Sequence, residues 1–472
     1  MITPDLTSLN IESVLTSNFV KKPNRGFCIF DDSKSKDSIP KLLDSLAKKY
    51  GTEAEAVVVI HRPIQGLSKI QQKADKFIDL RILEIPPNIG EMKAISYGRR
   101  ILRTKEQVIL RGSMTSKEAL ESIESGASKA YSAPIINDNK ASTPDATIIL
   151  AAFEHFTSIP VTLQTLEKNL HNIEVVIADD GSSPDYHKML LEKIETLSMP
   201  VFYCWQANRG FRVAASRNNG ILISSGNIII FFDGDSVPLP GTVEKHIQIH
   251  SEIEHKPRIL IGNRLLATNE DFDQATKYID FFSAIKDKVE RSIPEDDVKI
   301  RVSQIERYQF HPWRVGFTCN LSITNDINKT ESQLLFDENI RSRFGSEDLE
   351  YCYRYWLNNA NIRIDMGLNV IHRGGKISYA ANMAKASHQD IVLHAETLLY
   401  VISKYTDESF MLGFLDAMKY YVLNNKGKWQ SDPNMHQSIY QGTMQYLSWQ
   451  QSHIIEIKEY LNSAFNPLIS RK

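Results

Sequence analysis

Short apolar runs alternate with amphipathic segments through the middle of the chain. Residues 147–152 (TIILAA), 174–178 (EVVIA) and 227–232 (NIIIFF) each have the length and composition of one buried strand. Residues 159–170 and 212–224 lie between these runs and carry apolar positions at helical spacing. This alternation is typical of βαβ units on a mostly parallel sheet, so we predict an α/β fold.

Helical patterns dominate the later part of the chain. Residues 271–289 have the pattern of one long helix, and residues 290–299 form a polar stretch that indicates a loop. After residue 375 the apolar and aromatic positions return to helical spacing, as in FMLGFLDAMKYYVL. We therefore predict a helical C-terminal region over residues 376–472.

The N-terminal part of the chain repeats the βαβ pattern of the middle. Ser38-Ile39-Pro40 recurs as Ser158-Ile159-Pro160, a shift of 158 − 38 = 120. At the same shift four further positions coincide, Asn88, Gly90, Ala94 and Ser96 with Asn208, Gly210, Ala214 and Ser216. The acidic positions are not repeated. Where the second copy has Asp179-Asp180, the first has His61-Arg62, and where the second has Asp233-Gly234-Asp235, the first has Arg111-Gly112-Ser113. We predict that residues 1–135 are a degenerate copy that folds but binds no nucleotide.

Composition narrows the class of protein. A chain of 472 residues exceeds one compact core, so two or three domains are expected. The formal net charge of -2 gives no support for a nucleic-acid partner. Four scattered cysteines without a CxxC pair indicate a reducing compartment and no zinc site. No apolar run approaches the roughly 20 residues of a membrane span, and no signal peptide is recognisable. We expect a cytoplasmic protein, with attachment to the inner face of the membrane and homo-oligomerisation through the N-terminal domain left open.

Two carboxylates follow the third apolar run, in the triplet Asp233-Gly234-Asp235. Acids at i and i+2, where a strand enters a loop, can hold one hard divalent cation beside a diphosphate. Such a cation would neutralise charge on a leaving nucleotide. The same triplet is common in solvated loops and caps. Its position after a buried strand favours the functional interpretation, because ligands gather at the carboxyl ends of such strands.

A second acidic motif, Asp179-Asp180-Gly181-Ser182-Ser183, follows the second apolar run. These residue types suit a turn followed by a helix cap. The functional alternative is a carboxylate that accepts hydrogen bonds from a uracil ring or a ribose. Asn208-Arg209-Gly210 and Arg217-Asn218 add cationic groups suited to a phosphate or to the base-binding edge.

The order of these motifs resembles the family 2 glycosyltransferases. TIILAAFE, VVIADDGS, NRGFRVAASRNNGI and FFDGDS follow one another between residues 147 and 236. Two later blocks, GFTCNLSI and FDENIRSRFGSEDLEYCYRYW, are similar to the galactosyltransferase-type segment of chondroitin-polymerase-like enzymes and β-1,4-galactosyltransferases. The resemblance covers residues 143–375. It implies a GT-A (Rossmann-like) catalytic domain there and a GT-A-like half-domain over residues 1–135.

The resemblance also implies which residues bind the substrate and a metal. Contacts with the UDP-sugar are implied for residues at the strand ends: Ala151, Phe153, Asp180 with Asp179 as the alternative, Asn208, Gly210, Arg217, Asp233 and Gly234. Binding of Mn²⁺ or Mg²⁺ is implied for Asp233, Asp235 and His372, with Asp235 the more direct ligand. Judged from the residues alone, His372 is equally well explained as a polar residue that closes the strand of residues 369–371.

The pair Glu347-Asp348 corresponds to the Glu-Asp pair of the galactosyltransferase-type block. The resemblance implies that Asp348 is the general base and that Glu347 positions acceptor or donor hydroxyls. Both acids also suit the first turn of a helix, and the two interpretations are compatible. Related retaining polypeptide N-acetylgalactosaminyltransferases have Asn in place of the second acid, so Asp348 favours inversion. The chain has Phe344-Gly345-Ser346 where the family usually has Trp-Gly-Gly, a departure that bears on acceptor or sugar choice.

Together these features predict an inverting, metal-dependent hexosyltransferase of polysaccharide biosynthesis. It would transfer a hexose or N-acetylhexosamine from a UDP-sugar to a hydroxyl of an acceptor, with a glycan as the first choice. A retaining transferase of the same fold and a non-catalytic carbohydrate-binding or scaffold subunit are the alternatives. A nucleotidyltransferase would also use paired aspartates and a metal, but it would not need the Glu-Asp block.

Overall fold

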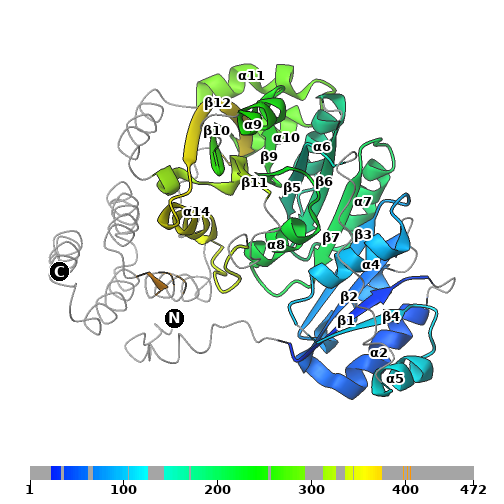
Figure 1. Cartoon of the computed structure of the whole chain (residues 1–472). Helices are drawn as coiled ribbons and strands as arrows, with labels where there is room; N and C mark the ends of the chain where they lie inside the picture. Colours follow the sequence, from blue (N-terminus) through cyan, green and yellow to red (C-terminus); the bar gives the residue numbers. More distant parts are fainter. Residues whose placement is uncertain are drawn as a thin grey trace, which may run out of the picture. The chain divides into compact units, whose positions relative to one another are not determined.

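The computed structural model describes residues 23–32, 37–61, 67–104, 106–125, 143–169, 172–252, 257–292, 312–325, 335–343 and 345–374, with residues 397, 401, 404 and 405. One compact unit spans residues 21–336 and 355–375, and a second unit includes residues 337–354. The first unit is built on a sheet with the strand order β4-β1-β2-β3-β7-β6-β5-β8-β11-β10-β12-β9 (Figure 1). The predicted α/β class is confirmed.

The N-terminal part of this sheet consists of parallel strands with helices packed on them. Its strands pair in the order β4-β1-β2-β3, and the pairs within this group are all parallel. The bounds are β1 (Arg25–Phe30), α2 (Ser38–Tyr50), β2 (Ala54–His61), α3 (Leu67–Gln71), β3 (Asp79–Ile85), α4 (Glu91–Arg100), β4 (Gln107–Arg111) and α5 (Ser116–Glu124). We call this part the N-terminal half of the sheet.

The strands that follow have the same order. They pair as β8-β5-β6-β7, again all parallel, and we call this part the central half. The bounds are β5 (Ala146–Ala152), α6 (Ser158–Asn169), β6 (Ile173–Asp179), α7 (Pro184–Ile194), β7 (Val201–Gln206), α8 (Val213–Ile223) and β8 (Ile228–Asp233). Every residue of β5 and β6 is buried, which is why both strands have continuous apolar sequences rather than alternating ones.

The two halves join through one antiparallel pair. Strand β3 pairs with β7, with Arg81 opposite Gln206 and Leu83 opposite Cys204. Helices α4 and α8 contact each other beside this junction (Figure 1). The equal strand order on both sides supports the proposed duplication, and the pairing makes one continuous sheet from the two copies.

The remaining elements follow β8 along the chain, and α14 among them begins in the second unit. Their bounds are β9 (Ser236–Pro238), α9 (Thr242–Ser251), β10 (Ile259–Ala267), α10 (Asn269–Ala275), α11 (Phe281–Ser292), β11 (Leu321–Thr324), α14 (Glu347–Leu357) and β12 (Ile362–Arg373). Strand β11 runs antiparallel to both β8 and β10, and the short strand β9 runs antiparallel to β12. This last pairing brings the end of β12 back to the turn that follows β8.

The prediction of one long helix over residues 271–289 is wrong. The segment forms α10 and α11, and Tyr278 and Ile279 between them are exposed. Each helix has its own capping side chain, because Thr268 accepts a hydrogen bond from the backbone N–H of Asp271 and Asp280 accepts one from Ser283. Helix α11 includes the first three residues of the predicted polar loop, and residues 293–299 lie outside the described residues.

The predicted helical C-terminal region also lies outside the described residues, apart from residues 397, 401, 404 and 405. Among the described residues, no helix has the length and apolar character that crossing a membrane requires.

Candidate nucleotide and metal site

The register of the sheet brings several predicted site residues together at one edge. Ala151 at the end of β5 pairs with Asp233 at the end of β8, and Ala152 pairs with Asp179 at the end of β6. These are carboxyl ends of neighbouring parallel strands, where ligands bind in open α/β sheets. Phe153 follows β5 with 47% of its surface exposed. The strand ends predicted from the apolar runs therefore do form one continuous edge.

A cluster of three potential metal ligands lies at the end of β8. One ligand atom each from Asp233, Asp235 and His372 lies within 4.8 Å of the others. His372 comes from β12 and reaches the cluster because it pairs with Ser236 of β9, and its Nε2 is 3.4 Å from Oδ1 of Asp235. Two carboxylates and one imidazole are a donor set that suits Mn²⁺, and Mg²⁺ shares the preference for carboxylate. The residues therefore fit a divalent cation.

The turn inside the triplet requires a glycine. A Cβ atom on Gly234 would lie 2.3 Å from the ring of His155 and 2.6 Å from the carbonyl oxygen of Ala151. Ser158 donates a hydrogen bond of 2.5 Å to the carbonyl oxygen of Gly234 and fixes the turn. Gly234 thus shapes the site through its backbone.

His155 lies beside the metal cluster, and the sequence analysis did not select it. Burial lowers its pKa, while the charges of Asp235 and Asp233 act in the opposite direction. A neutral imidazole at this position adds no positive charge beside a cation site. The sequence signal was its place two residues after Phe153 in TIILAAFEH, on the loop that follows β5.

Arg217 lies at the metal cluster as well. Its guanidinium donates to Asp233 at 2.8 Å and stacks on Phe336, with 5.6 Å from Cζ to the ring centre. From the sequence, this arginine suits either a phosphate or the base-binding edge, and its contact with Asp233 favours the phosphate side of the site.

The two acids at the end of β6 have different environments. The carboxylate of Asp179 accepts four hydrogen bonds: from the backbone N–H groups of Gly181 and Ser182, from the Ser182 hydroxyl and from the Tyr203 hydroxyl. Burial raises its pKa to about 6 in spite of these donors. Three of these donors share Oδ1 and Tyr203 takes one position on Oδ2, so Asp179 keeps little acceptor capacity for a ligand. Its contacts are those of a turn-stabilising residue.

Asp180 keeps acceptor capacity. Its Oδ1 accepts from the Gln206 amide at 2.6 Å, and its Oδ2 accepts from the backbone N–H of Arg212 at 2.6 Å. Burial raises its pKa to about 7, although both of these donors and the Arg212 charge lower it. With two of about four acceptor positions taken, Asp180 is the better candidate of the two for a ligand.

A loop from β7 to α8 packs directly against Asp180. Gly181 has a φ of 100°, and a Cβ there would lie 2.5 Å from the backbone of Asn208, so the two loops touch only because residue 181 is a glycine. Gly210 has a φ of 80°, and its N–H donates to the side chain of Asn208 at 3.3 Å. Asn208 and Gly210 are therefore placed next to the acidic motif.

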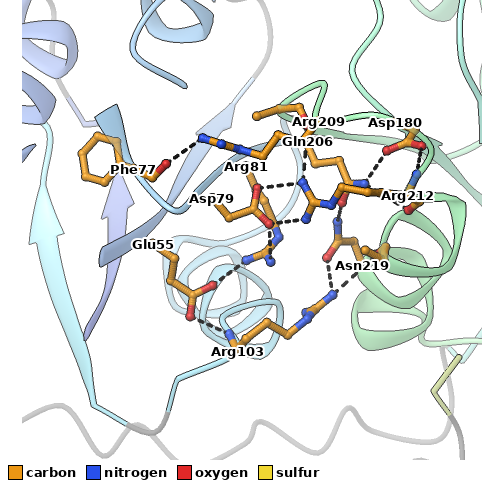
Figure 2. A network of polar contacts seen from close by, with 12 residues as sticks. Glu55, Phe77, Asp79, Arg81, Arg103, Asp180, Gln206, Arg209, Arg212 and Asn219 are labelled. Atoms are coloured by element: carbon orange, nitrogen blue, oxygen red, sulfur yellow. Dashed lines mark hydrogen bonds and ion pairs between the residues drawn. The ribbon is translucent and has the colours of Figure 1, made fainter. Parts of the chain in front are cut away.

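Arg209 in the same loop differs from the expectation that it faces a phosphate. Its guanidinium donates to the carbonyl oxygens of Phe77 at 2.7 Å and Ala74 at 3.1 Å, both in the N-terminal half (Figure 2). The arginine anchors the loop to the other copy of the repeat.

The corresponding edge of the N-terminal half has two acids directly after β1 that the sequence comparison missed, Asp31 and Asp32. Asp32, two residues after β1, accepts hydrogen bonds from the N–H and the hydroxyl of Ser113 at 2.8 and 2.9 Å and pairs with Arg111 at 3.3 Å. Its counterpart in the central half is Ala152 (32 + 120 = 152). The carboxylate is thus engaged by the residues that replaced the acidic triplet, which supports the proposal that this copy binds no nucleotide.

Glu347 and Asp348 belong to the second unit, where they begin helix α14. Glu347 is buried, and Oδ1 of Asp348 accepts a hydrogen bond from the N–H of Leu349 at 2.8 Å. The predicted helix start is confirmed. The preceding Ser346 has a φ of 95°, a conformation that favours glycine and so accounts for the Gly that the family usually has there.

Part of the chain matches the model of a known protein family. Residues 147–303 match the model of glycosyl transferase family 2. Chondroitin synthase of Escherichia coli is 25% identical over 245 residues, which are 48% of this chain and 34% of the synthase. Hyaluronan synthase of Pasteurella multocida is 25% identical over 243 residues, 48% of this chain and 24% of the synthase. The chain thus spans about a third or less of the length of these relatives.

Solved structures also align with the chain. The S. aureus TarS 1–349 structure in complex with UDP-GlcNAc covers 63% of this chain and 81% of its own, with 13% identity and a TM-score of 0.40. The family match falls on the segment whose motifs predicted it. Residues 147–303 are therefore similar to the family 2 glycosyltransferases, and about half of the chain is similar to parts of the chondroitin and hyaluronan synthases.

Proposed function

We propose that the protein transfers a hexose or N-acetylhexosamine from a UDP-sugar to a hydroxyl group of a glycan acceptor, with inversion at the anomeric carbon. The observation that carries the proposal is the cluster of Asp233, Asp235 and His372 at the same sheet edge as Asp180, with both aspartates inside the residues that match the family 2 model. A divalent cation on this cluster, Mn²⁺ or Mg²⁺, would neutralise charge on the leaving diphosphate.

The residues around the cluster divide the work of binding the donor. Asp180 accepts a hydrogen bond from the uracil with its remaining acceptor capacity, and the loop of Asn208 and Gly210 borders the ribose. Arg217 holds the Asp233 carboxylate in one orientation through its 2.8 Å contact. Phe153 offers an exposed ring on the same edge, and a ring of this kind can stack on a base.

Asp348 is the proposed general base. It takes the proton of the acceptor hydroxyl while that oxygen attacks the anomeric carbon. The new carbon–oxygen bond forms as the bond to UDP breaks, and UDP leaves with the electron pair. A single displacement of this kind inverts the configuration. Determining the anomeric configuration of the product would separate it from a retaining transferase.

Release of UDP from a panel of UDP-sugars, measured with Mn²⁺ and again after its removal by EDTA, tests the proposal. We expect release with at least one hexose or N-acetylhexosamine donor, a strong dependence on the cation, and binding of one UDP per chain. A chain that binds no UDP in the presence of Mn²⁺ would point instead to a scaffold or carbohydrate-binding subunit.

UDP affinity should also depend on pH through Asp180. Its pKa is raised to about 7, so the ionised acceptor is lost as the pH falls below that value, by about tenfold per pH unit. Arg212 and Asp179 are the charged groups that act on it. We expect the Kd for UDP to rise between pH 8 and pH 6 in titration calorimetry. Asp180→Asn, which cannot ionise, should bind more weakly at pH 8 and lack this component, and an identical pH profile in the variant would contradict the assignment.

A further inference from the structure

A cluster of buried charges lies where the N-terminal half meets the nucleotide loop. It consists of Glu55, Asp79, Arg81, Arg103 and Arg212, which we call the buried charge cluster (Figure 2). Four of its members expose 8% of their surface or less, and Arg103 is half-buried. Together with Asp180 the cluster holds three carboxylates and three guanidinium groups, so the buried charges balance.

The first connection to Asp180 runs through Arg212. The guanidinium of Arg212 binds Asp79 of β3, with 2.5 Å between Nη2 and Oδ2, and the backbone N–H of the same arginine donates to Asp180. Burial acts to raise the pKa of Asp79, but Arg81 and Arg212 outweigh burial and lower it, so this carboxylate is charged. The side chain from the N-terminal half therefore fixes the residue whose N–H holds Oδ2 of Asp180.

The second connection to Asp180 ends on its other carboxylate oxygen, Oδ1. Arg103 donates to Oδ1 of Asn219 at 2.9 Å, Asn219 donates to Gln206 at 3.0 Å, and Gln206 donates to Oδ1 of Asp180 at 2.6 Å. The backbone N–H of Arg103 is itself held by Glu55 at 2.7 Å. Asn219 and Gln206 are fully buried, so their amide groups have no water to replace a lost partner.

The loop between these two connections is also attached to the N-terminal half. Residues 207–212 include Gly210 in a left-handed conformation, and the backbone N–H of Ala207 donates to the carbonyl oxygen of Leu80 in β3. With the two bonds of Arg209, the loop is attached to residues 74–80 of the N-terminal half at its beginning, middle and end. Without that surface, the loop would lose the contacts that fix its backbone.

We propose that Asp79 and Arg103 of the N-terminal half are positioning residues for UDP-sugar binding, because they orient the Asp180 carboxylate through two separate hydrogen-bond chains. The inference rests on the proposed function, in which Asp180 accepts a hydrogen bond from uracil. It assigns a role to the degenerate copy, which supplies no ligand and instead supplies the surface on which the nucleotide loop is built.

The experiment compares UDP binding and donor kinetics in the full chain with Mn²⁺ present. Asp79→Asn should raise the Kd for UDP and the KM for the UDP-sugar by about 10-fold to 100-fold, the range found for residues that orient a primary ligand. The kcat at saturating donor should change much less, because the chemistry is elsewhere. Arg212→Gln should have a similar effect, and the double variant Asp79→Asn/Arg212→Gln should bind no worse than either single variant, because both remove one interaction.

A matched control separates positioning from folding. Val108 is buried in β4, at the far edge of the N-terminal half, so Val108→Ala destabilises the same part of the protein without touching the buried charge cluster. We expect Val108→Ala to lower the melting temperature and to leave the Kd for UDP unchanged. Arg103→Gln, at a half-buried position, tests the second chain if Asp79→Asn fails to fold, and should raise the Kd several-fold.

The outcomes distinguish the inference from the function on which it rests. If the unmodified chain binds no UDP, the proposed function fails and the inference with it. If the unmodified chain binds UDP and Asp79→Asn binds it with the same affinity, the function stands and the positioning role is overturned. Where Asp79→Asn does not fold, an unchanged affinity of Arg103→Gln leads to the same conclusion. A Kd that rises equally in Val108→Ala would also overturn it, because general destabilisation would then explain the effect.

Discussion

Replacing Asp235 by alanine should abolish sugar transfer and weaken manganese binding by orders of magnitude, while the protein stays folded. The substitution removes one of three side chains whose ligand atoms lie within 4.8 Å of one another. Metal ions contribute several kcal/mol to transition-state stabilisation, so turnover should fall by about 10³-fold or more. The fold should survive because the main-chain bond at this turn, from the N–H of Arg373 to the carbonyl oxygen of Asp235, does not involve the side chain.

Asp273→Ala is the matched control for that experiment. Asp273 is a nearby, half-exposed aspartate that pairs with Arg373 at 2.7 Å and does not belong to the cluster. The Asp273→Ala variant should retain manganese binding, measured by electron paramagnetic resonance, and most of the turnover of the unmodified protein. Near-normal turnover of Asp235→Ala in metal-free buffer would show that the cluster is not a metal site.

Replacing Asp348 by asparagine should cut turnover by about 10²-fold or more and leave UDP-sugar binding nearly intact, the usual result of losing a general base. The amide oxygen of asparagine can still accept the hydrogen bond that Asp348 receives from the N–H of Leu349, so the start of α14 should be preserved. Single-turnover rates and the Kd for UDP, measured on the same preparation, separate the two effects.

Glu350, two residues further along α14, gives the contrasting variant. It is fully buried, pairs with Arg354 and accepts hydrogen bonds from Lys404 and Tyr405, so its role is structural. Glu350→Gln should lower the melting temperature and have a smaller effect on the rate of the chemical step. Equal losses of binding and turnover in Asp348→Asn would place Asp348 in the same structural class and remove it as the base.

The sequence predicted β5, β6 and β8 of the central half well, because these buried parallel strands are largely continuous apolar runs. The run of residues 147–152 became β5 (Ala146–Ala152), and the run of residues 227–232 became β8 (Ile228–Asp233). The break between α10 and α11 was missed because residues 276–280 contain neither proline nor glycine, so only the capping pattern of Asp280 and Ser283 signalled it.

The site was predicted at the level of motifs and not of individual contacts. Asp179 and Asp180 are both acids at the end of one strand, and only the hydrogen bonds that each accepts distinguish them. Glu55 of β2 and Asp79 of β3 are charged residues near the start of their strands, where charge usually indicates exposure to solvent. They are buried here because β3 pairs with β7 in the middle of the sheet, and strand pairing between distant segments leaves no local mark in the sequence.

The junction between β3 and β7 has a consequence for the ancestry of the chain. Leu83 and Tyr203 are equivalent positions of the repeat (203 − 83 = 120), and so are Glu84 and Cys204 (204 − 84 = 120). In the sheet, Leu83 lies opposite Cys204 and Glu84 opposite Tyr203, so equivalent residues exchange partners across a local two-fold axis. This is the geometry of an isologous homodimer joined along one edge strand, here within a single polypeptide. Covalent linkage makes such an interface independent of protein concentration, so in the proposed duplication one copy could lose its acids while its surface went on supporting the other.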